Sequence, residues 1–297
     1  MHKSIFVVSQ NLPCFRILRI GRAILFTFFT FHGGGTSAEN KLAVIGKFTN
    51  ESCIKCHIKS NPKLIADWKR SKHGTAENRT NCVSCHGSSH ETAGSASRRN
   101  SSCTSCHGDK NTPVVHSYNL SRHGVLMTLE ENSYDWNQPL ENANYRSPSC
   151  AYCHMHEGNH YVESAFIYSS PADSLKINSD QKGKEIRRVC LDCHAPRYTE
   201  MLFSNGDKMF EIAAMKFREA ELLINNSTIK YSNEEMRIAK KQFEIMKNHL
   251  LNVWIGTGHQ SPDYQWWHGQ PALDGDLLRI KGMILELERK KNLEIKQ

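Results

Sequence analysis

The feature that most constrains this 297-residue chain is a pentapeptide, Cys-x-x-Cys-His, that occurs five times. The paired cysteines and the following histidine of the five motifs are Cys53, Cys56 and His57; Cys82, Cys85 and His86; Cys103, Cys106 and His107; Cys150, Cys153 and His154; and Cys190, Cys193 and His194. Because the chain holds 16 histidines, one chance match at the last position is about 1 in 20, and five together roughly one in a few million.

Three kinds of site use paired cysteines: a zinc site, a thiol–disulfide switch and the attachment site of a c-type heme. Neither zinc nor a redox dithiol needs a histidine directly after the second cysteine. A c-type heme uses all three residues, because two thiols bond to the porphyrin vinyl groups and the adjacent imidazole reaches the iron. The sequence therefore predicts five covalently attached c-type hemes, each with a proximal histidine from its motif.

Residues 1–38 have the pattern of a secretory signal. Four basic residues and no acidic one accompany an apolar run, Ala23–Phe31, and a small-residue exit that ends at Ala38. The run is too short to cross a bilayer, which needs about 20 apolar residues, although an uncleaved anchor stays an alternative. Export agrees with the attachment of heme c outside the cytoplasm, so we expect a periplasmic or extracytoplasmic protein.

The formal charge of +8 would suit a nucleic-acid partner, but four of the positive charges lie in residues 1–38. The propionates of bound hemes add negative charge, which removes the electrostatic basis for nucleic-acid binding. Residues 39–200, the predicted pentaheme-binding region, have few periodic apolar stretches and no strand-like alternation. We expect the porphyrins to supply the missing apolar volume and the region to be unfolded without them.

Residues 201–297 are predicted to form a C-terminal helical hairpin with a third helix, so the fold class is mainly α with little strand. Apolar residues recur there in steps of three and four, typical of amphipathic helices with a narrow seam: Phe210, Ala213, Phe217, Ala220 and Ile224; Met236, Ala239, Phe243, Met246, Leu250 and Val253; and Leu277, Ile280, Ile284 and Leu287. The seams suit an intrachain bundle or a subunit interface. Ser232 and Glu235 form a capping-box pattern before the second helix. Residues 256–275 lack a helical period and are predicted to be a His- and aromatic-rich loop that contacts a cofactor or a partner.

Each heme iron also needs a ligand on its other face. Nine histidines outside the motifs and residues 1–38 are available: His73, His90, His116, His123, His156, His160, His249, His259 and His268. His73 and His123 share the pattern Ser-x-His-Gly after a helical stretch, which indicates axial ligation, and His90, His160 and His268 are further candidates. A second imidazole makes an iron six-coordinate and suited to relaying electrons.

The chain resembles the hydroxylamine oxidoreductase family of multiheme cytochromes c. The resemblance is carried by "CVSCH…CTSCH", "SRHG" and "PSCAYCHM" between Cys82 and Met155, and by "SPDYQWWHG" over Ser261–Gly269. It implies a helical heme array, redox partner proteins such as other cytochromes or quinol-linked complexes, and a homo-oligomer. It also implies a catalytic role for Tyr264, which matches the family tyrosine that bonds to a catalytic heme.

The chain departs from that family in three ways. It encodes fewer hemes than the family enzymes, the surroundings of their catalytic heme are not recognisable, and all five motifs end in histidine, unlike the catalytic motif of pentaheme nitrite reductases. The preferred hypothesis is a pentaheme electron carrier. The alternatives are an enzyme that oxidises hydroxylamine or hydrazine, or reduces nitrite or hydroxylamine, at one open heme, and a structural subunit of a larger cytochrome complex.

Overall fold

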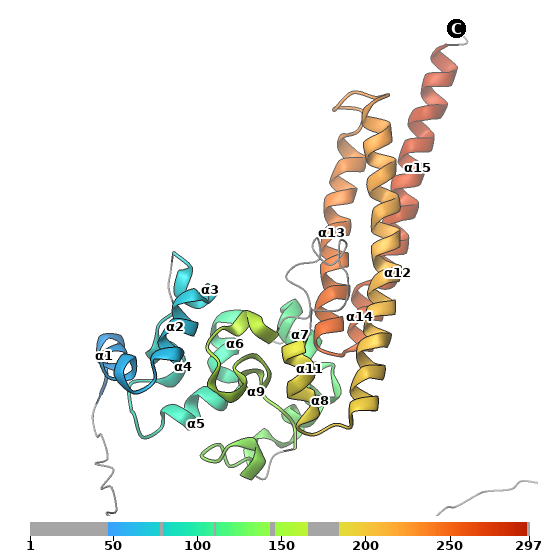
Figure 1. The fold of residues 1–297 in the computed structure, drawn as a ribbon. Helices are drawn as coiled ribbons and strands as arrows, with labels where there is room; N and C mark the ends of the chain where they lie inside the picture. The colour runs from blue at the N-terminus through green and yellow to red at the C-terminus, as the bar shows by residue number, and fades with distance from the viewer. Residues whose placement is uncertain (1–46, 78–79, 110, 143–145, 166–183, 296–297) are drawn as a thin grey trace, which may run out of the picture. The chain divides into compact units, whose positions relative to one another are not determined.

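The computed structural model describes residues 47–77, 80–109, 111–142, 146–165 and 184–295, all within one compact unit, residues 43–297. The predicted signal, residues 1–38, lies outside the described residues. Within them, helices make up the regular structure, and a single isolated bridge pairs Lys47 with Ser89 (Figure 1). The predicted mainly α fold class is therefore confirmed. No helix in the described part is long and apolar enough to span a membrane.

The first part of the unit consists of short helices joined by turns and 3-10 segments. The helices are α1 (Asn50–Ser60), α2 (Pro62–Arg70), α3 (Lys72–Thr75), α4 (Cys82–His86), α5 (Ala93–Arg98), α6 (Ser101–His107), α7 (Pro113–Asn119), α8 (Arg122–Glu130), α9 (Cys150–His154) and α11 (Lys184–Leu191), and the 3-10 segments are η1 (Glu131–Ser133), η2 (Leu140–Asn142), η3 (His156–Gly158) and η4 (Val162–Ala165). The second part holds α12 (Pro196–Thr228), α13 (Arg237–Gly258), α14 (Pro262–His268) and α15 (Gln270–Glu294).

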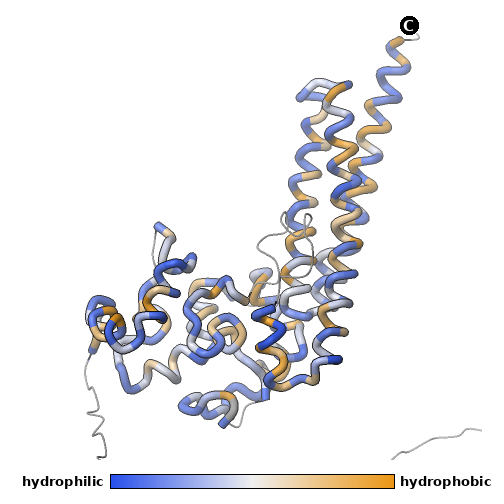
Figure 2. Tube along the Cα trace, viewed as in Figure 1, coloured by the Kyte–Doolittle hydropathy of each residue, from blue (hydrophilic) through white to orange (hydrophobic). Residues whose placement is uncertain are grey.

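The two parts differ in how they bury apolar side chains. Among the short helices the described apolar clusters are small: one holds Met127, Tyr134 and Trp136, and another joins Ile186 and Val189 to Phe203 of α12. The long helices show regular bands of hydrophobic and hydrophilic residues, whereas the short helices are mostly hydrophilic (Figure 2). The short helices thus lack a protein core of the size that the bundle has.

Helices α12, α13 and α15 form a three-helix bundle in which each helix contacts the other two. Its core contains the predicted seam residues, with Leu287 packed against it at the edge. The capping box is formed, because Ser232 N donates to Glu235 (2.7 Å) and Glu235 N donates to Ser232 Oγ (3.3 Å). It precedes α13, which begins after one intervening turn at Arg237. The intrachain bundle accounts for the seams.

The prediction of a loop over residues 256–275 was wrong. Helix α13 continues to Gly258, α14 occupies Pro262–His268 and α15 begins at Gln270. Residues 256–275 show no helical spacing of apolar residues, because α14 packs against α13 and α15 through very close backbone contacts and not through an apolar seam. A β-carbon on Gly269 would lie 2.3 Å from a Val253 methyl group, so only glycine permits this sharp helix junction.

Candidate heme sites

The first four motifs each lie within one short helix. In a helix, residues three and four positions apart share a face, so both cysteines and the histidine of a motif project from the same side. The fifth motif begins in α11, and its last residues continue the turn, since His194 N donates to Cys190 O at 2.9 Å. Local helix geometry therefore gives every motif the arrangement that covalent heme attachment requires.

The cysteines of consecutive motifs interact with one another. Thiols interact between motifs one and two (Cys53 and Cys82), two and three, three and four (Cys103 and Cys150), and four and five. The five motifs thus follow one another in space as they do in sequence. No disulfide joins any of the ten motif cysteines, all of which lie in the described residues, and burial raises the pKa of the Cys153 thiol to about 12. In the described residues no group of three or more His, Cys, Asp or Glu is arranged to hold a bare metal ion.

Every motif histidine is paired with a histidine from elsewhere in the chain. The pairs and the distances between their ring centres are His57 with His90, 6.5 Å; His86 with His160, 6.1 Å; His107 with His73, 6.0 Å; His154 with His259, 6.5 Å; and His194 with His123, 6.0 Å. A metal–nitrogen bond of about 2 Å on each side, added to the half-width of each ring, separates two ring centres by about 6 Å. The five spacings therefore fit one six-coordinate iron between each pair.

The rings of the first two pairs line a common space. A cavity of about 330 Å³ is bordered by α1, α2 and α4 and by the paired histidines of motifs one and two. Cysteines of both motifs also line it, among them Cys53 and Cys82. Thiols and imidazoles open into the same volume, and its walls are mainly apolar, as a porphyrin needs.

Hydrogen bonds at Nδ1 orient several of these rings. His86 Nδ1 contacts Ala93 O at 3.1 Å, and His160 Nδ1 contacts Gly158 O at 2.7 Å. His259 Nδ1 contacts the Ser117 hydroxyl. A partner at Nδ1 leaves Nε2 to face a metal and fixes the ring direction. Burial, helped by the nearby His154, lowers the pKa of His259 to about 3, so this imidazole is held in the neutral form that binds iron.

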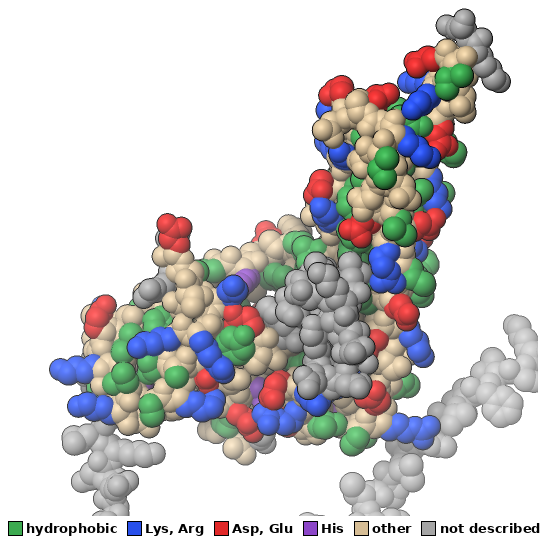
Figure 3. Space-filling model, turned by 45° about the horizontal axis from the view of Figure 1, so that its top comes forward, with side chains coloured by type: hydrophobic (Ala, Val, Ile, Leu, Met, Phe, Trp, Pro, Cys, Tyr) green, Lys and Arg blue, Asp and Glu red, His purple; other side chains and the backbone are tan. Residues whose placement is uncertain are grey.

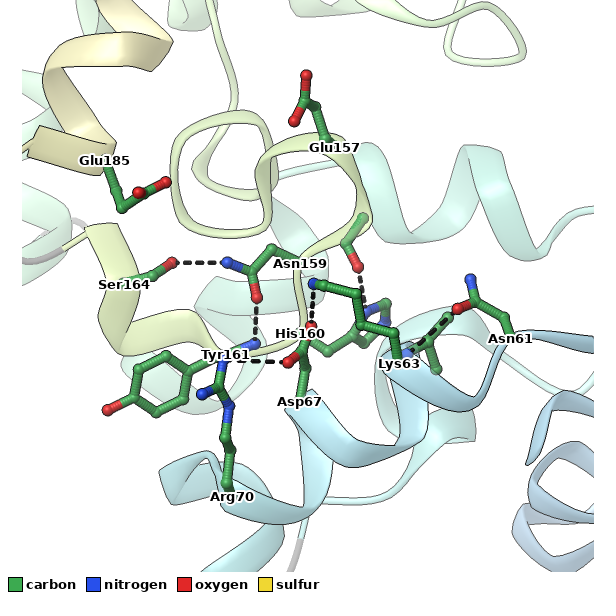
Figure 4. A network of polar contacts seen from close by, with 12 residues as sticks. Asn61, Lys63, Asp67, Arg70, Glu157, Asn159, His160, Tyr161, Ser164 and Glu185 are labelled. Atoms are coloured by element: carbon green, nitrogen blue, oxygen red, sulfur yellow. Dashed lines mark hydrogen bonds and ion pairs between the residues drawn. The ribbon is translucent and has the colours of Figure 1, made fainter.

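The segment that carries His160 contacts α2 and α3, and Figure 4 shows its contact with α2. The Arg70 guanidinium lies 4.3 Å from the centre of the Tyr161 ring, and Glu163 accepts a 2.6 Å hydrogen bond from the backbone nitrogen of Lys72. Asp67 in turn accepts from Arg70 at 3.0 Å. These contacts hold the ring of His160 beside the first two motifs.

The two Ser-x-His-Gly segments have the same structure. Ser71 and Ser121 cap α3 and α8, and each accepts from the backbone nitrogen of the glycine three residues later, at 3.3 and 3.1 Å. A β-carbon on Gly74 would lie 2.1 Å from a backbone oxygen, and one on Gly124 would lie 2.0 Å from the equivalent oxygen. The glycine lets the turn press against the preceding helix, so both histidines are presented in the same way.

The likeness extends beyond these turns. Motifs one and two, with the Ser71 turn between them, form one unit, and motifs three and four, with the Ser121 turn between them, form a second unit of the same kind. Asn50 Oδ1 accepts from the backbone nitrogen of Cys82 at 3.0 Å, and Asn100 Oδ1 accepts from that of Cys150 at 2.9 Å. Each asparagine lies three residues before the first cysteine of its own motif. Motifs one and two are therefore held together by the same bond as motifs three and four.

In each unit an aromatic side chain donates a hydrogen bond to the backbone just before the second motif of that unit. Trp68 Nε1 donates to Thr80 O at 2.9 Å, and the Tyr118 hydroxyl donates to Pro148 O at 2.8 Å. Both acceptors lie two residues before the first cysteine of the following motif. The aromatic residue, the serine and the histidine each recur fifty positions later, so the sequence itself contains the signal for this repeat.

Four of the five predicted distal ligands, His73, His90, His123 and His160, are paired with motif histidines. The fifth, His268, is placed elsewhere, with its ring centre 4.9 Å from that of His116. The histidine paired with His154 is His259, which lacks the Ser-x-His-Gly pattern. The sequence pointed to His259 only through its position in residues 256–275, the segment predicted to contact a cofactor or a partner.

Tyr264 is buried at 2% exposure and stacks on His268, with ring centres 4.7 Å apart. Its hydroxyl donates to Asn252 Oδ1 at 3.2 Å, and burial raises its pKa. The phenol therefore has a polar partner within the chain, as buried tyrosines usually do. Its predicted catalytic role stays a prediction.

Comparison with known proteins supports covalently bound heme c. A family model described as "Seven times multi-haem cytochrome CxxCH" matches residues 65–231, which include four of the five motifs. The chain is 26% identical over 325 residues to a curated protein of Kuenenia stuttgartiensis, "Probable nitrite reductase-hydroxylamine oxidoreductase fusion protein". The match covers 74% of this chain, and the chain spans only 38% of that relative.

Two solved structures are similar in fold. One is the "Kuenenia stuttgartiensis reducing HAO-like protein complex Kustc0457/Kustc0458", with a TM-score of 0.50, 17% identity and coverage of 83% of this chain and 87% of that one. The other, "Hypothetical multiheme protein", has a TM-score of 0.53, 15% identity and coverage of 72% and 59%. They confirm the predicted fold and, with the curated relative, the resemblance to hydroxylamine oxidoreductase-like cytochromes.

Proposed function

The chain belongs to the multi-haem CxxCH cytochrome family, and from this membership we propose that it is a pentaheme c-type cytochrome that relays electrons outside the cytoplasm. The observation that carries the proposal is the second histidine opposite every motif histidine. Iron with two imidazole ligands has no free position for a substrate, and it changes little in geometry between its two oxidation states. Such hemes transfer electrons.

The row of motifs makes the relay continuous. Because the thiols of each motif interact with those of the next, hemes attached to them would be close neighbours along the chain. His259 takes the place of His268 as the distal ligand of the fourth heme. The hemes would also supply the apolar interior that the short helices lack.

Extracytoplasmic location rests on the basic and apolar pattern of residues 1–38 and on the chemistry of heme attachment. The names of the relatives suggest an association with cytochromes of nitrogen-compound metabolism. We accordingly assign another cytochrome or a quinol-linked complex as the redox partner, within a homo-oligomer. Small nitrogen compounds would react at the partner.

The test combines mass and spin state of the purified holoprotein. Intact mass should show five hemes on one chain, and electron paramagnetic resonance of the oxidised protein should show low-spin iron without a high-spin signal. Cyanide and nitrite should leave the spectrum unchanged. A high-spin fraction that binds nitrite, together with a heme that stays on the Tyr264 peptide after thioether cleavage, would replace the carrier with the enzyme.

A further inference from the structure

The first motif lies at one end of the row, on a helix that is open to solvent. Helix α1 buries none of its residues, as is also true of α4, α6 and α9, and Cys56 is exposed, like Cys106 and Cys193, so its position at the end of the row is what distinguishes the first motif. The cavity between α1, α2 and α4 lies directly beneath this surface. A heme held by Cys53, Cys56 and His57 would therefore have an edge close to the outside of the protein.

The surface above this site is strongly basic. Residues 47–77 carry seven basic and three acidic side chains, a net charge of +4 with histidines neutral. We call the seven basic side chains the basic face; all are exposed: Lys47, Lys55, Lys59, Lys63, Lys69, Arg70 and Lys72. Figure 3 shows several Lys and Arg side chains gathered over this N-terminal part. The two propionates of one bound heme would still leave the segment positive.

Most of this charge is not neutralised by the protein itself. Buried Asp67 forms ion pairs with Lys63 at 2.6 Å and with Arg70 at 3.0 Å (Figure 4). Within the described residues Lys55, Lys59, Lys69 and Lys72 form no ion pair. By contrast, residues 126–165, around the fourth motif, carry six acidic side chains and one basic, so the surroundings of the first and fourth motifs differ in the sign of their charge.

A small apolar spot accompanies the charge. Ile58 of α1 is 46% exposed, one residue from Lys59 and two residues from Cys56. An apolar contact ringed by unpaired charge of one sign is the usual composition of a transient redox interface, in which charge steers the encounter and a small dry contact brings the cofactors together.

We propose that the basic face of α1–α3 is the docking surface for a redox protein with an acidic surface, and that one electron at a time crosses it through the heme site of Cys53, Cys56 and His57. This proposal rests on the relay function proposed above. In each transfer the partner's reduced cofactor loses one electron and one ferric heme becomes ferrous, or the reverse.

The experiment measures the rate at which a reduced flavodoxin, a small acidic one-electron carrier, reduces the oxidised holoprotein in a stopped-flow instrument. The variant K55E/K59E/K69E reverses three unpaired charges of the basic face. The matched control, K208E/K230E/K241E, makes the same change of net charge at exposed lysines of the bundle region that form no ion pair within the described residues.

At low salt we expect the basic-face variant to lower the second-order rate constant by at least about tenfold, because electrostatic steering raises association rates by that order. The rate of the unmodified protein should fall steeply as salt rises, and that of the variant should not. The control should keep the original rate and salt dependence. Equal loss in both variants, or loss in neither, would overturn the proposal.

Two further measurements separate this proposal from its premise. The reduced methyl viologen radical, a small cationic one-electron donor of low potential, should reduce all five hemes of both variants, since it needs no docking surface. Failure to do so would contradict the relay instead. The holoprotein should also not sediment with vesicles of anionic phospholipid at physiological salt. If the unmodified protein sediments with the vesicles and the basic-face variant does not, while both react with flavodoxin at the same rate, the basic face binds a membrane. That result would overturn the proposal.

Discussion

At the scale of single residues, the pairs of histidines depend on neighbours that fix each ring. Ser117 and His259 are the clearest case, because a hydroxyl on α7 binds Nδ1 of a ring at the end of α13. The contact brings a residue of the bundle to the fourth motif. Burial lowers the pKa of His259, and the Ser117 hydroxyl still gives the buried ring a hydrogen-bond partner.

The first prediction distinguishes His259 from His268. His259→Ala should convert one of five hemes to high spin and raise its potential, because one imidazole is lost. His268→Ala should leave all five hemes low-spin, since its ring contacts His116 and Tyr264. Electron paramagnetic resonance of both oxidised variants measures the spin state of the hemes. A high-spin heme in His268→Ala and none in His259→Ala would identify His268 as the ligand instead.

At the scale of elements, short turns decide which imidazole reaches which motif. The turns at Gly74 and Gly124 follow helices that carry an aromatic residue at the same position, and each tucks its glycine beneath the helix backbone. In each repeated unit the Ser-x-His-Gly histidine is paired with a motif histidine from outside that unit. His73 of the first unit is paired with His107, and His123 of the second is paired with His194. The repeated turn thus links successive units.

The second prediction tests this turn. Gly124→Ala should destabilise the holoprotein by about 3 kcal/mol, because its β-carbon would collide with the Tyr118 carbonyl and force the turn away. The displaced His123 should give a high-spin fraction at one heme. Gly282→Ala, in the middle of α15 with open space around it, is the matched control and should be neutral or stabilise by up to about 1 kcal/mol.

Thermal unfolding and the spin state of the two glycine variants provide the measurement. A Gly124→Ala protein with the melting temperature and low-spin spectrum of the control would show that the turn can relax. In that case the close contact would not be what positions His123.

At the scale of the whole molecule, two kinds of interior coexist. The bundle has a continuous apolar core, which includes fully buried Met236, Met246 and Ile280. The short helices around the motifs have only small apolar clusters within the described residues. Folding of the first part should therefore depend on heme, whereas the bundle has the means to fold by itself.

The third prediction follows from this difference. When all ten motif cysteines are replaced by alanine, amide hydrogens of α1–α9 should exchange rapidly, because no porphyrin fills the interior. Amides of α12, α13 and α15 should keep most of their protection. Hydrogen exchange read by mass spectrometry gives both results in one experiment. Strong protection of α1–α9 in that variant would contradict a heme-dependent fold.

The sequence was most informative where the governing interactions are local. The motif Cys-x-x-Cys-His determines heme chemistry within one helical turn, and the three seams of α12, α13 and α15 follow from residues three and four positions apart. The Ser-x-His-Gly pattern also lies within a single turn, which is why His73 and His123 could be singled out from the sequence as candidate ligands. Residues 256–275 were misjudged because α14 owes its form to close packing at Gly256 and Gly269, which leaves no apolar period.

Only the tertiary structure decided which histidines belong together. Both rings of a pair come from separate segments, and no local rule links His154 to His259 or His57 to His90. The sequence by itself determined the number of Cys-x-x-Cys-His motifs and the helical bundle, because each depends on near neighbours in the chain. The placement of His259 beside His154, and of His268 beside His116, depended on how α13 and α14 pack beside α7. Such a contact between distant segments leaves no periodic trace in the sequence.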